Sequence, residues 1–562
     1  MIPATPSTTL QASLETLARN RQAWLAVPLI DKIAYLRTIT HRFLEVSDDL
    51  VADALAAKGL DPSYAGEEWV SGPVSFFRTC RFLAESLAGI ARTGRVPIAD
   101  GAIGEGPDGR VTIDVMPGDR WDRIQYRGWT GRVWMEPGIH LAEARDHLGS
   151  FYTKPGTATA AVAVVLGAGN VASIAPLDLV HKLFVEGHVV LVKFSPVNEY
   201  IGPHVEHAFA PLVDAGFVRF AYGGSEVGEY LVSHPLVDEV HITGSEHTHD
   251  LIVFGAGHEG AARKARNEPR LMKRVTSELG NVSPVVVVPG NWSRRALAWQ
   301  AHHVATQVVQ NAGYNCNAGK VVIVPGGWRR RDDFIEAVAA AMASRPERRA
   351  YYPGSEARYE RARVGAPLIR ELGPRRDGVI PPTILEGFGP DDDAPVFTEE
   401  AFCQVVAVVD LAETAPGRFL AAAVDFCNER LRGSLNATII VDPRTAGSPD
   451  TGVARATDRL QYGSVGINVW AAAAFSLGVT PWGAYPGHRL DDVRSGIGFV
   501  HNARLIDRPQ KTVMRAPFVM FPPPPWSVFH RHAATALRAV ARFEAAPGAI
   551  RFAAVMGPAL RP

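Results

Sequence analysis

Two hydrophobic patterns divide the chain. From about residue 8 to 150, apolar residues recur at three- and four-residue steps, as in LQASLETLARNRQAWLAV (10–27) and DKIAYLRTITHRFLEV (31–46). This spacing predicts amphipathic helices. Near residues 95–140 Gly, Asp, Arg and Trp become frequent, which indicates strands and loops.

After residue 160 short β-branched runs alternate with helical stretches. The runs are AAVAVVLGAGN (160–170), APLDLVHKLFVEG (175–187), HVVLVKFSP (188–196), VEHAFAPLVDAG (205–216), FVRFAYGG (217–224) and EVHITGS (239–245). Such alternation is typical of a parallel sheet covered on both faces. Ligands of these sheets bind beyond the carboxyl ends of the strands.

A second series of apolar runs follows. Its members are PVVVVPG (284–290), KVVIVPGG (320–327), VVAVVDL (405–411), NATIIVDP (436–443) and SVGINVW (464–470). We therefore predict an α/β protein with a Rossmann-like cofactor domain and a second α/β catalytic domain. The predicted regions are 1–276 for the helical N-terminal part and dinucleotide-binding domain, 277–480 for the catalytic domain, and 481–562 for a return segment and an appended tail. The tail contains PPPP (522–525) and the helix-like HAATALRAVARFEAA (532–546).

Composition narrows the function classes. The 562 residues are 47% hydrophobic and 21% charged, with 58 basic and 58 acidic residues, so the balance is that of a globular protein and no excess charge indicates nucleic acid or an anionic membrane. Four cysteines stand far apart without zinc-ligand spacing, which predicts no metal and favours a reducing compartment. The N-terminus lacks the pattern of a signal peptide, and the apolar runs are too short to cross a bilayer. We expect a cytoplasmic protein without a membrane span.

Glycines and a lysine mark the ends of the first strands. Gly224 and Gly228 follow one strand in YGGSEVGEYL, and Gly244 and Ser245 follow another in HITGS. Free N–H groups at helix starts favour a phosphate-bearing ligand, although a turn that needs glycine for its conformation explains them equally well. Lys193 ends the strand HVVLVKFSP, where it can reach a ribose or phosphate or simply face solvent.

Two side chains are candidates for covalent chemistry. Glu278 precedes a very apolar strand in VTSELGNVSPVVVV, so desolvation would raise its pKa and make it a usable base. A surface carboxylate is the alternative. Cys316 lies among small and polar residues in NAGYNCNAGK, a poor setting for a buried hydrophobe. A thiol there becomes a strong nucleophile if its surroundings favour the thiolate.

Taken in order, these stretches resemble the aldehyde dehydrogenase superfamily. SELGNVSP is similar to that family's ELGGKSP motif, NAGYNCNAGK to NxGQxCxA, HITGS to FTGS, and TEEAFCQVVAV to EEIFGPV. CNERLRGSLNATIIV, LQYGSVGINVW and TPWGAYPGH resemble later family segments, and the resemblance runs from roughly residue 155 to 490. It implies oxidation of an aldehyde to a carboxylic acid with NAD or NADP.

The resemblance implies roles residue by residue. Cys316 would be the nucleophile that forms a thiohemiacetal and then a thioester, and Glu278 would activate the hydrolytic water. The Asn170 amide and the Cys316 backbone N–H would hold the oxyanion. The implied cofactor-binding residues are Lys193, Ser195, Gly224, Gly228, Gly244, Ser245, Glu400 and Phe402. A homodimer or homotetramer is also implied.

Departures from the family motifs bear on substrate and coenzyme. PWN has become AGN, which removes an aromatic wall, and KPxE has become KFSP, so that Pro196 replaces a glutamate that grips the adenosine ribose. Losing that carboxylate removes a repulsion against a 2′-phosphate and leaves both NAD and NADP open. GQxC has become GYNC, and the segment between Ser245 and Glu278 carries the insert FGAGHEGAARKARNEPR.

Two alternatives share the same scaffold. An acylating enzyme would pass the acyl group from Cys316 to coenzyme A or another thiol, although a water-activating Glu278 favours hydrolysis. A dinucleotide-binding protein without turnover would need no simultaneous retention of Asn170, Glu278 and Cys316.

Overall fold

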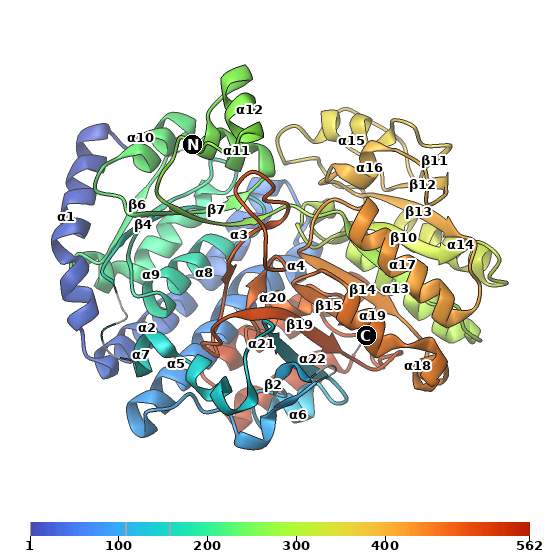
Figure 1. Ribbon diagram of the computed structural model, residues 1–562, viewed down its shortest axis with the longest axis horizontal. Coiled ribbons are helices and arrows are strands. Elements are labelled where there is room, and N and C mark those ends of the chain that lie inside the picture. The colour runs from blue at the N-terminus through green and yellow to red at the C-terminus, as the bar shows by residue number, and fades with distance from the viewer. Residues whose placement is uncertain (1, 107–108, 155, 157–158, 562) are drawn as a thin grey trace.

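The computed structural model describes residues 2–106, 109–154, 156 and 159–561, which fold into two lobes built on separate sheets (Figure 1). The helices of the described residues are α1 (Ser7–Ala26), α2 (Leu29–Glu45), α3 (Ser47–Lys58), α4 (Ala65–Trp69), α5 (Ser75–Thr93), α6 (Asp122–Gln125), α7 (Ser150–Thr153), α8 (Ile174–Val180), α9 (Gly202–Asp214), α10 (Ser225–Ser233), α11 (Glu246–Phe254), α12 (Gly257–Ala265), α13 (Arg294–Val309), α14 (Arg331–Ala343), α15 (Ser355–Arg363), α16 (Pro395–Thr398), α17 (Pro416–Arg430), α18 (Pro443–Gly447), α19 (Val453–Arg459), α20 (Ala473–Ser476), α21 (Ala533–Ala545) and α22 (Ala549–Ala559). The strands are β1 (Ile103–Glu105), β2 (Val111–Met116), β3 (Thr130–Met135), β4 (Val162–Leu166), β5 (Val189–Lys193), β6 (Val218–Ala221), β7 (Glu239–Gly244), β8 (Arg274–Leu279), β9 (Ser283–Val287), β10 (Gly319–Pro325), β11 (Leu368–Glu371), β12 (Thr383–Phe388), β13 (Val405–Leu411), β14 (Asn436–Ile440), β15 (Ser464–Ile467), β16 (Trp482–Gly483), β17 (Gly496–Ile497), β18 (Phe499–Val500) and β19 (Pro509–Arg515).

The first lobe is built on a sheet whose described strands run in the order β17-β8-β7-β4-β5-β6. All neighbours pair in parallel except β17, which is antiparallel to β8. The strand β4 is buried from Val162 to Val165, as expected for a strand covered on both faces. The helices α1 and α8 both pack on β4 and β5. The predicted α/β fold with strand–helix alternation is therefore confirmed here.

The second lobe is built on a larger sheet. Among the described residues its strands run in the order β1-β2-β3-β19-β15-β14-β9-β10-β13-β12-β11. The central strands pair in parallel, and an antiparallel hairpin of β2 and β3 joins through β19. Strands predicted between residues 95 and 140 are thus confirmed as β1–β3. The division of the chain at residues 276 and 480 stays a prediction.

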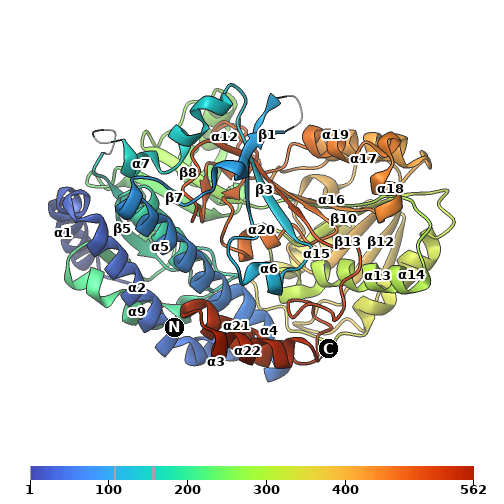
Figure 2. The same ribbon diagram turned by 90° about the horizontal axis from the view of Figure 1, so that it is seen from below.

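The tail after residue 505 folds back on the N-terminal helices. Its helix α21 packs against α4 and α5, and Figure 2 shows α21 and α22 beside α4. The Arg78 guanidinium pairs with the Glu544 carboxylate at 2.7 Å, and both side chains are buried. Arg78 also pairs with Asp122, and Glu544 with Arg81, so the tail is tied into a buried network of ion pairs. The tail is therefore an integral part of the fold: it adds β19 to the sheet of the second lobe and packs α21 on helices of the first.

No helix within the described residues is long and apolar enough to span a membrane.

Candidate active site

A cleft of about 1130 Å³ lies between the two lobes. The eleven candidate residues predicted from the sequence all line it. They are Asn170, Lys193, Ser195, Gly224, Gly228, Gly244, Ser245, Glu278, Cys316, Glu400 and Phe402. The structure thus brings the whole predicted set to one place, while the role of each residue stays a prediction.

The carboxyl ends of the first lobe's parallel strands form one wall of the cleft. Lys193 ends β5, Gly244 ends β7, and Asn170 lies in the loop after β4. Gly224 and Ser245 are the N-cap residues of α10 and α11, and the Ser245 hydroxyl accepts a hydrogen bond from the Thr248 N–H. The chain path of a parallel α/β sheet therefore places these residues together although they are distant in sequence.

The second lobe supplies the opposite wall. Glu400 and Phe402 lie between α16 and β13, and the Phe402 ring contacts Tyr352 with ring centroids 4.9 Å apart. The Glu400 carboxylate packs so closely on Gly280 that a Cβ there would meet Oε2 at 2.2 Å. Burial raises the pKa of Glu400 to about 7, while Lys320 and the Asn281 N–H act in the opposite direction. Its Oε1 is buried and has no hydrogen-bond partner among the described residues.

Cys316 and Glu278 are in direct contact inside the cleft. Their side chains form a hydrogen bond, and the Trp482 Nε1–H donates a second one to Glu278 Oε1 at 3.1 Å. Burial is the main cause that raises the pKa of Glu278 to about 7, and these two hydrogen bonds oppose it. The expectation of a desolvated carboxylate near neutrality agrees with this environment. Trp482, in the stretch TPWGAYPGH, was not predicted as a site residue.

The surroundings of Cys316 do not favour the thiolate. The residue is partly exposed. Desolvation and the nearby Glu278 and Glu400 carboxylates raise the pKa of its thiol well above the usual value, whereas its own backbone N–H lowers it. The described residues around the sulfur therefore do not stabilise the thiolate. The sequence argument for reactivity had required such a setting. The thiolate must instead form by transfer of the thiol proton to a neighbouring base. Glu278 is suited to this role because it is hydrogen-bonded to the thiol.

Asn170 is oriented by a hydrogen bond to the loop that carries the cysteine. Its Nδ2 donates to the Tyr314 carbonyl at 2.9 Å, which uses one of the two N–H groups of the amide. The residue is 5% exposed and lines the cleft beside Cys316. The second N–H can serve an oxygen of a bound substrate.

The loop before Cys316 has an unusual backbone. Asn311, Ala312 and Gly313 have φ values of 52°, 54° and 76°, a left-handed run that side chains other than glycine rarely adopt. At Gly313 a Cβ would also meet the Cys403 carbonyl carbon at 2.4 Å. Such strain persists only where the surroundings hold the backbone firmly.

Asn311 provides that support. Its Nδ2 donates to the Asn170 carbonyl at 3.0 Å and to the Tyr314 carbonyl at 3.2 Å, and its Oδ1 accepts from Lys58 Nζ at 3.2 Å. Its backbone N–H donates to Glu67 Oε2 at 2.7 Å. One asparagine therefore fixes both the nucleophile loop and the Asn170 loop.

Buried ion pairs from the N-terminal helices hold this asparagine in turn. Lys58 Nζ pairs with Glu68 at 2.7 Å, and Glu67 pairs with Arg348 from the second lobe. Burial is the largest single influence and lowers the pKa of Lys58, but Glu68, Tyr200 and Glu67 together outweigh it and keep that pKa above its usual value. These residues were missed from the sequence because Asn311 and Arg348, which Lys58 and Glu67 contact, lie more than two hundred positions away. The only available signal was Asn311 itself, the first residue of the nucleophile stretch.

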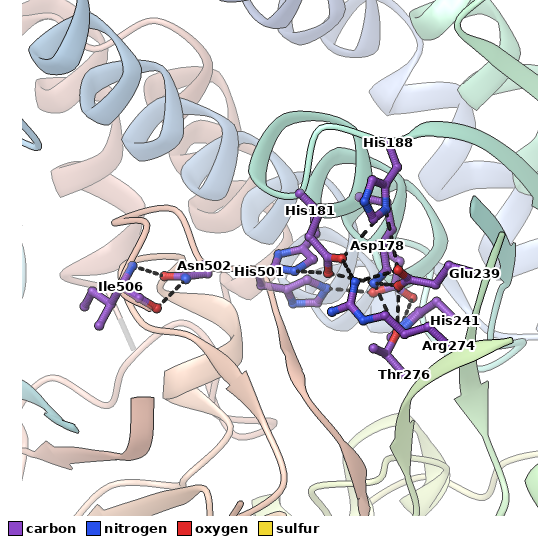
Figure 3. Close-up of polar contacts among 12 residues, drawn as sticks. Asp178, His181, His188, Glu239, His241, Arg274, Thr276, His501, Asn502 and Ile506 are labelled. Atoms are coloured by element: carbon purple, nitrogen blue, oxygen red, sulfur yellow. Dashed lines mark hydrogen bonds and ion pairs between the residues drawn. The ribbon is translucent and has the colours of Figure 1, made fainter. Parts of the chain in front are cut away.

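Asp178 lies close to Glu278 and has the opposite environment. It accepts hydrogen bonds from Thr243 Oγ1 at 2.8 Å and His501 Nε2 at 3.2 Å, and His241 Nε2 lies 3.6 Å away (Figure 3). Burial alone would raise the pKa of Asp178, yet the two histidines hold it below its usual value. A permanent negative charge at this position disfavours ionisation of Glu278 and so adds to its raised pKa.

A nearby cluster has a metal-like composition. One ligand atom each of Glu186, His188 and Glu239 lies within 4.8 Å of the others, and Figure 3 labels His188 and Glu239. Lys182 and Arg274, however, form ion pairs with both carboxylates. The carboxylate charge is thus already balanced by cations, and the cluster fits a structural ion network.

Known proteins resemble the chain in sequence over one segment and in structure over most of its length. Residues 161–350 match the sequence model of the Aldehyde dehydrogenase family. The search of curated proteins gave no match. Among solved structures, the chain is similar to Mycobacterium tuberculosis aldehyde dehydrogenase complexed with NAD+, with a TM-score of 0.62 and 18% identity over 93% of this chain and 92% of that one. It is also similar to NADP-dependent glyceraldehyde-3-phosphate dehydrogenase from Bacillus halodurans C-125 complexed with NADP, with a TM-score of 0.61 and 17% identity over 91% and 92%.

A third similar structure is gamma-glutamyl-gamma-aminobutyraldehyde dehydrogenase from Burkholderia cenocepacia J2315, with a TM-score of 0.60 and 19% identity over 91% of this chain and 89% of that one. At these identities the structures establish the fold: a Rossmann-like lobe and an α/β lobe around a shared cleft. The matched segment 161–350 contains the stretches around Asn170, Glu278 and Cys316. The chain therefore has the fold of these aldehyde dehydrogenases, and its segment 161–350 is similar in sequence to their family.

Proposed function

We propose that this protein is an NAD(P)-dependent aldehyde dehydrogenase that oxidises an aldehyde, with water, to a carboxylic acid and reduces the dinucleotide. The contact between Cys316 and Glu278 inside the cleft carries this proposal. A thiol and a carboxylate that exchange one proton beside an amide donor are suited to covalent catalysis at a carbonyl.

The cleft has features that fit a dinucleotide. A Cβ added at Gly228 or at Gly244 would meet nothing within 4 Å, so the floor at the helix starts is open. Lys193, Arg358 and Arg432 line the same cleft and can neutralise phosphates. The unpartnered Oε1 of Glu400 is an acceptor for a ribose hydroxyl. When bound, the nicotinamide would supply the hydride acceptor.

The first step uses the hydrogen bond between Cys316 and Glu278. The thiol proton passes to the carboxylate, whose pKa of about 7 lets it accept a proton near neutral pH. The sulfur bonds to the carbonyl carbon, and the free N–H of Asn170 stabilises the oxygen that becomes negative. One such donor contributes roughly 3–4 kcal/mol.

The second step releases the acid. Once the substrate carbon has lost its hydride, it is held on Cys316 as a thioester. Glu278 first releases to solvent the proton that it took from Cys316. It then takes a proton from water while the water oxygen bonds to the acyl carbon, and when the carbon–sulfur bond breaks, the sulfur takes this proton back from Glu278 to restore the thiol. The Trp482 N–H holds the carboxylate in place during these proton transfers.

The test follows absorbance of the reduced nicotinamide over a panel of aldehydes with NAD and with NADP, in wild type and Cys316→Ala. Turnover that requires Cys316 but no added thiol supports the proposal. Strict dependence on coenzyme A would assign the acylating reaction instead. Dinucleotide binding without any Cys316-dependent turnover would leave a binding protein.

A further inference from the structure

The tail of the chain encloses a second cavity. We call this cavity the chamber, and its volume is about 730 Å³. Residues 517–526, α21 and α22 form one wall, and the segments 70–74, 124–129 and 469–477 form the other. Its volume lies within the range of about 300–1,000 Å³ typical of pockets for small molecules.

A small cavity lies between the cleft and the chamber, and we call it the neck. Asn170, Glu278 and Cys316 line both the neck and the cleft. Asn315 and Phe475 line both the neck and the chamber. The neck has about 20 Å³ of space, which is room for one group the size of a water molecule. An aldehyde group fits that space beside Cys316, and a substrate chain that leaves the neck past Asn315 and Phe475 enters the chamber.

The lining of the chamber is almost uncharged. Of the described residues around it, only Arg127 carries a charge, and its side chain is exposed. A phosphorylated or carboxylate-bearing chain would find no buried cation there. The aromatic rings of Trp129, Trp470 and Trp526 and many aliphatic side chains form the remaining surface.

Large apolar side chains are also exposed at the chamber. Ile124, Phe521 and Leu560 are 56%, 76% and 54% exposed, and all three line it. Exposed apolar groups gathered at one cavity mark a binding surface for an apolar ligand or partner.

The chamber wall is fixed in place. Besides the buried pair of Arg78 and Glu544, the Phe543 ring packs against Trp121 and Phe552 with centroids 5.6 and 5.5 Å apart. A wall that is already ordered gives a ligand its contact area without an ordering cost.

We infer that the chamber binds the hydrocarbon part of the substrate, so that this protein selects aldehydes with long apolar chains. The inference rests on the proposed function and adds a substrate class to it. It also gives the tail a role: Met556 and Leu560 of the tail contact the substrate chain.

Chain length is the first test. The ratio kcat/KM is measured for unbranched aldehydes from acetaldehyde to decanal at a fixed dinucleotide concentration. Each added CH₂ is expected to raise kcat/KM about three- to fourfold until the chamber is filled, the fold-change that corresponds to ~0.8 kcal/mol per buried methylene. A flat series with active acetaldehyde would overturn the inference and leave the proposed function standing.

Matched variants on one helix locate the effect. Met556→Trp places bulk in the chamber, whereas Ile550→Trp lies on the same helix, is 89% exposed and does not line the chamber. We expect Met556→Trp to lower kcat/KM for decanal at least tenfold and for acetaldehyde less than twofold, and Ile550→Trp to change neither. Equal losses for both aldehydes in Met556→Trp would contradict the inference.

Binding and assembly measurements separate the remaining explanations. Decanamide, which cannot be oxidised, is titrated calorimetrically into wild type and Met556→Trp. Loss of binding in the variant supports the chamber even if no aldehyde is turned over. If Met556→Trp does not fold, Leu560→Asp at the exposed rim replaces it. A change of mass by light scattering in Leu560→Asp, with an unchanged preference for decanal, would show that the rim joins copies of the chain and would overturn the inference.

Discussion

The cleft and the chamber lie on either side of the neck that Cys316 lines, but they are lined by opposite chemistry. Lys193, Arg270, Arg358, Arg432 and Arg494 all reach the cleft, together with several glutamates, whereas the chamber has the single exposed Arg127. Charged groups recognise phosphates and hydroxyls at defined positions, and their effect is weakened by salt. Apolar area recognises size and depends little on salt. A dinucleotide and a hydrocarbon chain therefore have distinct places on either side of the reacting sulfur.

The contrast between the cleft and the chamber also bears on the raised pKa values of Cys316 and Glu278, which lie where the cleft meets the neck. Cys316 and Glu278 line both the polar cleft and the narrow neck, so water has limited access to them. Desolvation is the main cause of both shifts. The apolar side thus affects the chemistry even though it contributes no reacting group.

The largest predicted effect comes from removing Cys316, which lines the cleft and the neck. Cys316→Ala should lower turnover of short and long aldehydes alike by at least about 10³-fold, because no other group forms the covalent intermediate. Reduced-nicotinamide absorbance measures this. Cys427→Ala, which removes a buried thiol that lines neither cavity, is the control and should stay active. Residual turnover of decanal in Cys316→Ala would mean that the chamber has its own chemistry.

The next effect concerns the base. Glu278→Gln should lower hydrolytic turnover about 10²–10⁴-fold. It should also let an acyl group accumulate on Cys316, detectable by mass spectrometry of the intact protein. In wild type, activity should fall as the pH decreases through about 7, because the carboxylate becomes protonated and can no longer accept a proton. A variant that keeps both the wild-type rate and its pH profile would assign the base to another residue.

Sequence patterns predicted more of the cleft than of the chamber. Lys193, Gly244 and Cys316 stand next to short apolar runs, and the parallel-sheet rule brings strand ends together, so their meeting could be expected. The chamber depends on contacts such as that between Arg78 and Glu544, separated by 466 positions, and no local pattern encodes such a distance.

The protonation of Cys316 was also beyond reach of the sequence. Its thiol pKa depends on Glu278 and Glu400, which approach it only in the folded chain. The same holds for Asn311, whose partners Lys58 and Glu67 lie more than two hundred residues upstream. The residues next to Cys316 in the sequence indicated that its side chain is partly exposed. They did not indicate whether its thiol is protonated.

A smaller effect is expected for the oxyanion donor. Asn170→Ala should lower kcat about 10²–10³-fold with little change in KM, because the contact strengthens only as the carbonyl oxygen becomes negative. Steady-state kinetics with decanal and acetaldehyde measures the split, and both should lose the same factor. A rise in KM confined to decanal would instead make Asn170 part of the chamber entrance.

The smallest predicted effect concerns only the cleft, where the dinucleotide is proposed to bind. Lys193→Ala should raise KM for the dinucleotide roughly tenfold, the loss of one charge-assisted hydrogen bond of ~1.4 kcal/mol, and leave kcat nearly unchanged. Wild-type KM for the dinucleotide should rise with ionic strength, and this dependence should weaken in the variant because one screened contact is missing. The ratio of decanal to acetaldehyde efficiency should stay constant at every salt concentration, since the chamber carries no buried charge. A variant in which that ratio changes with salt would show that the two cavities do not recognise their ligands independently.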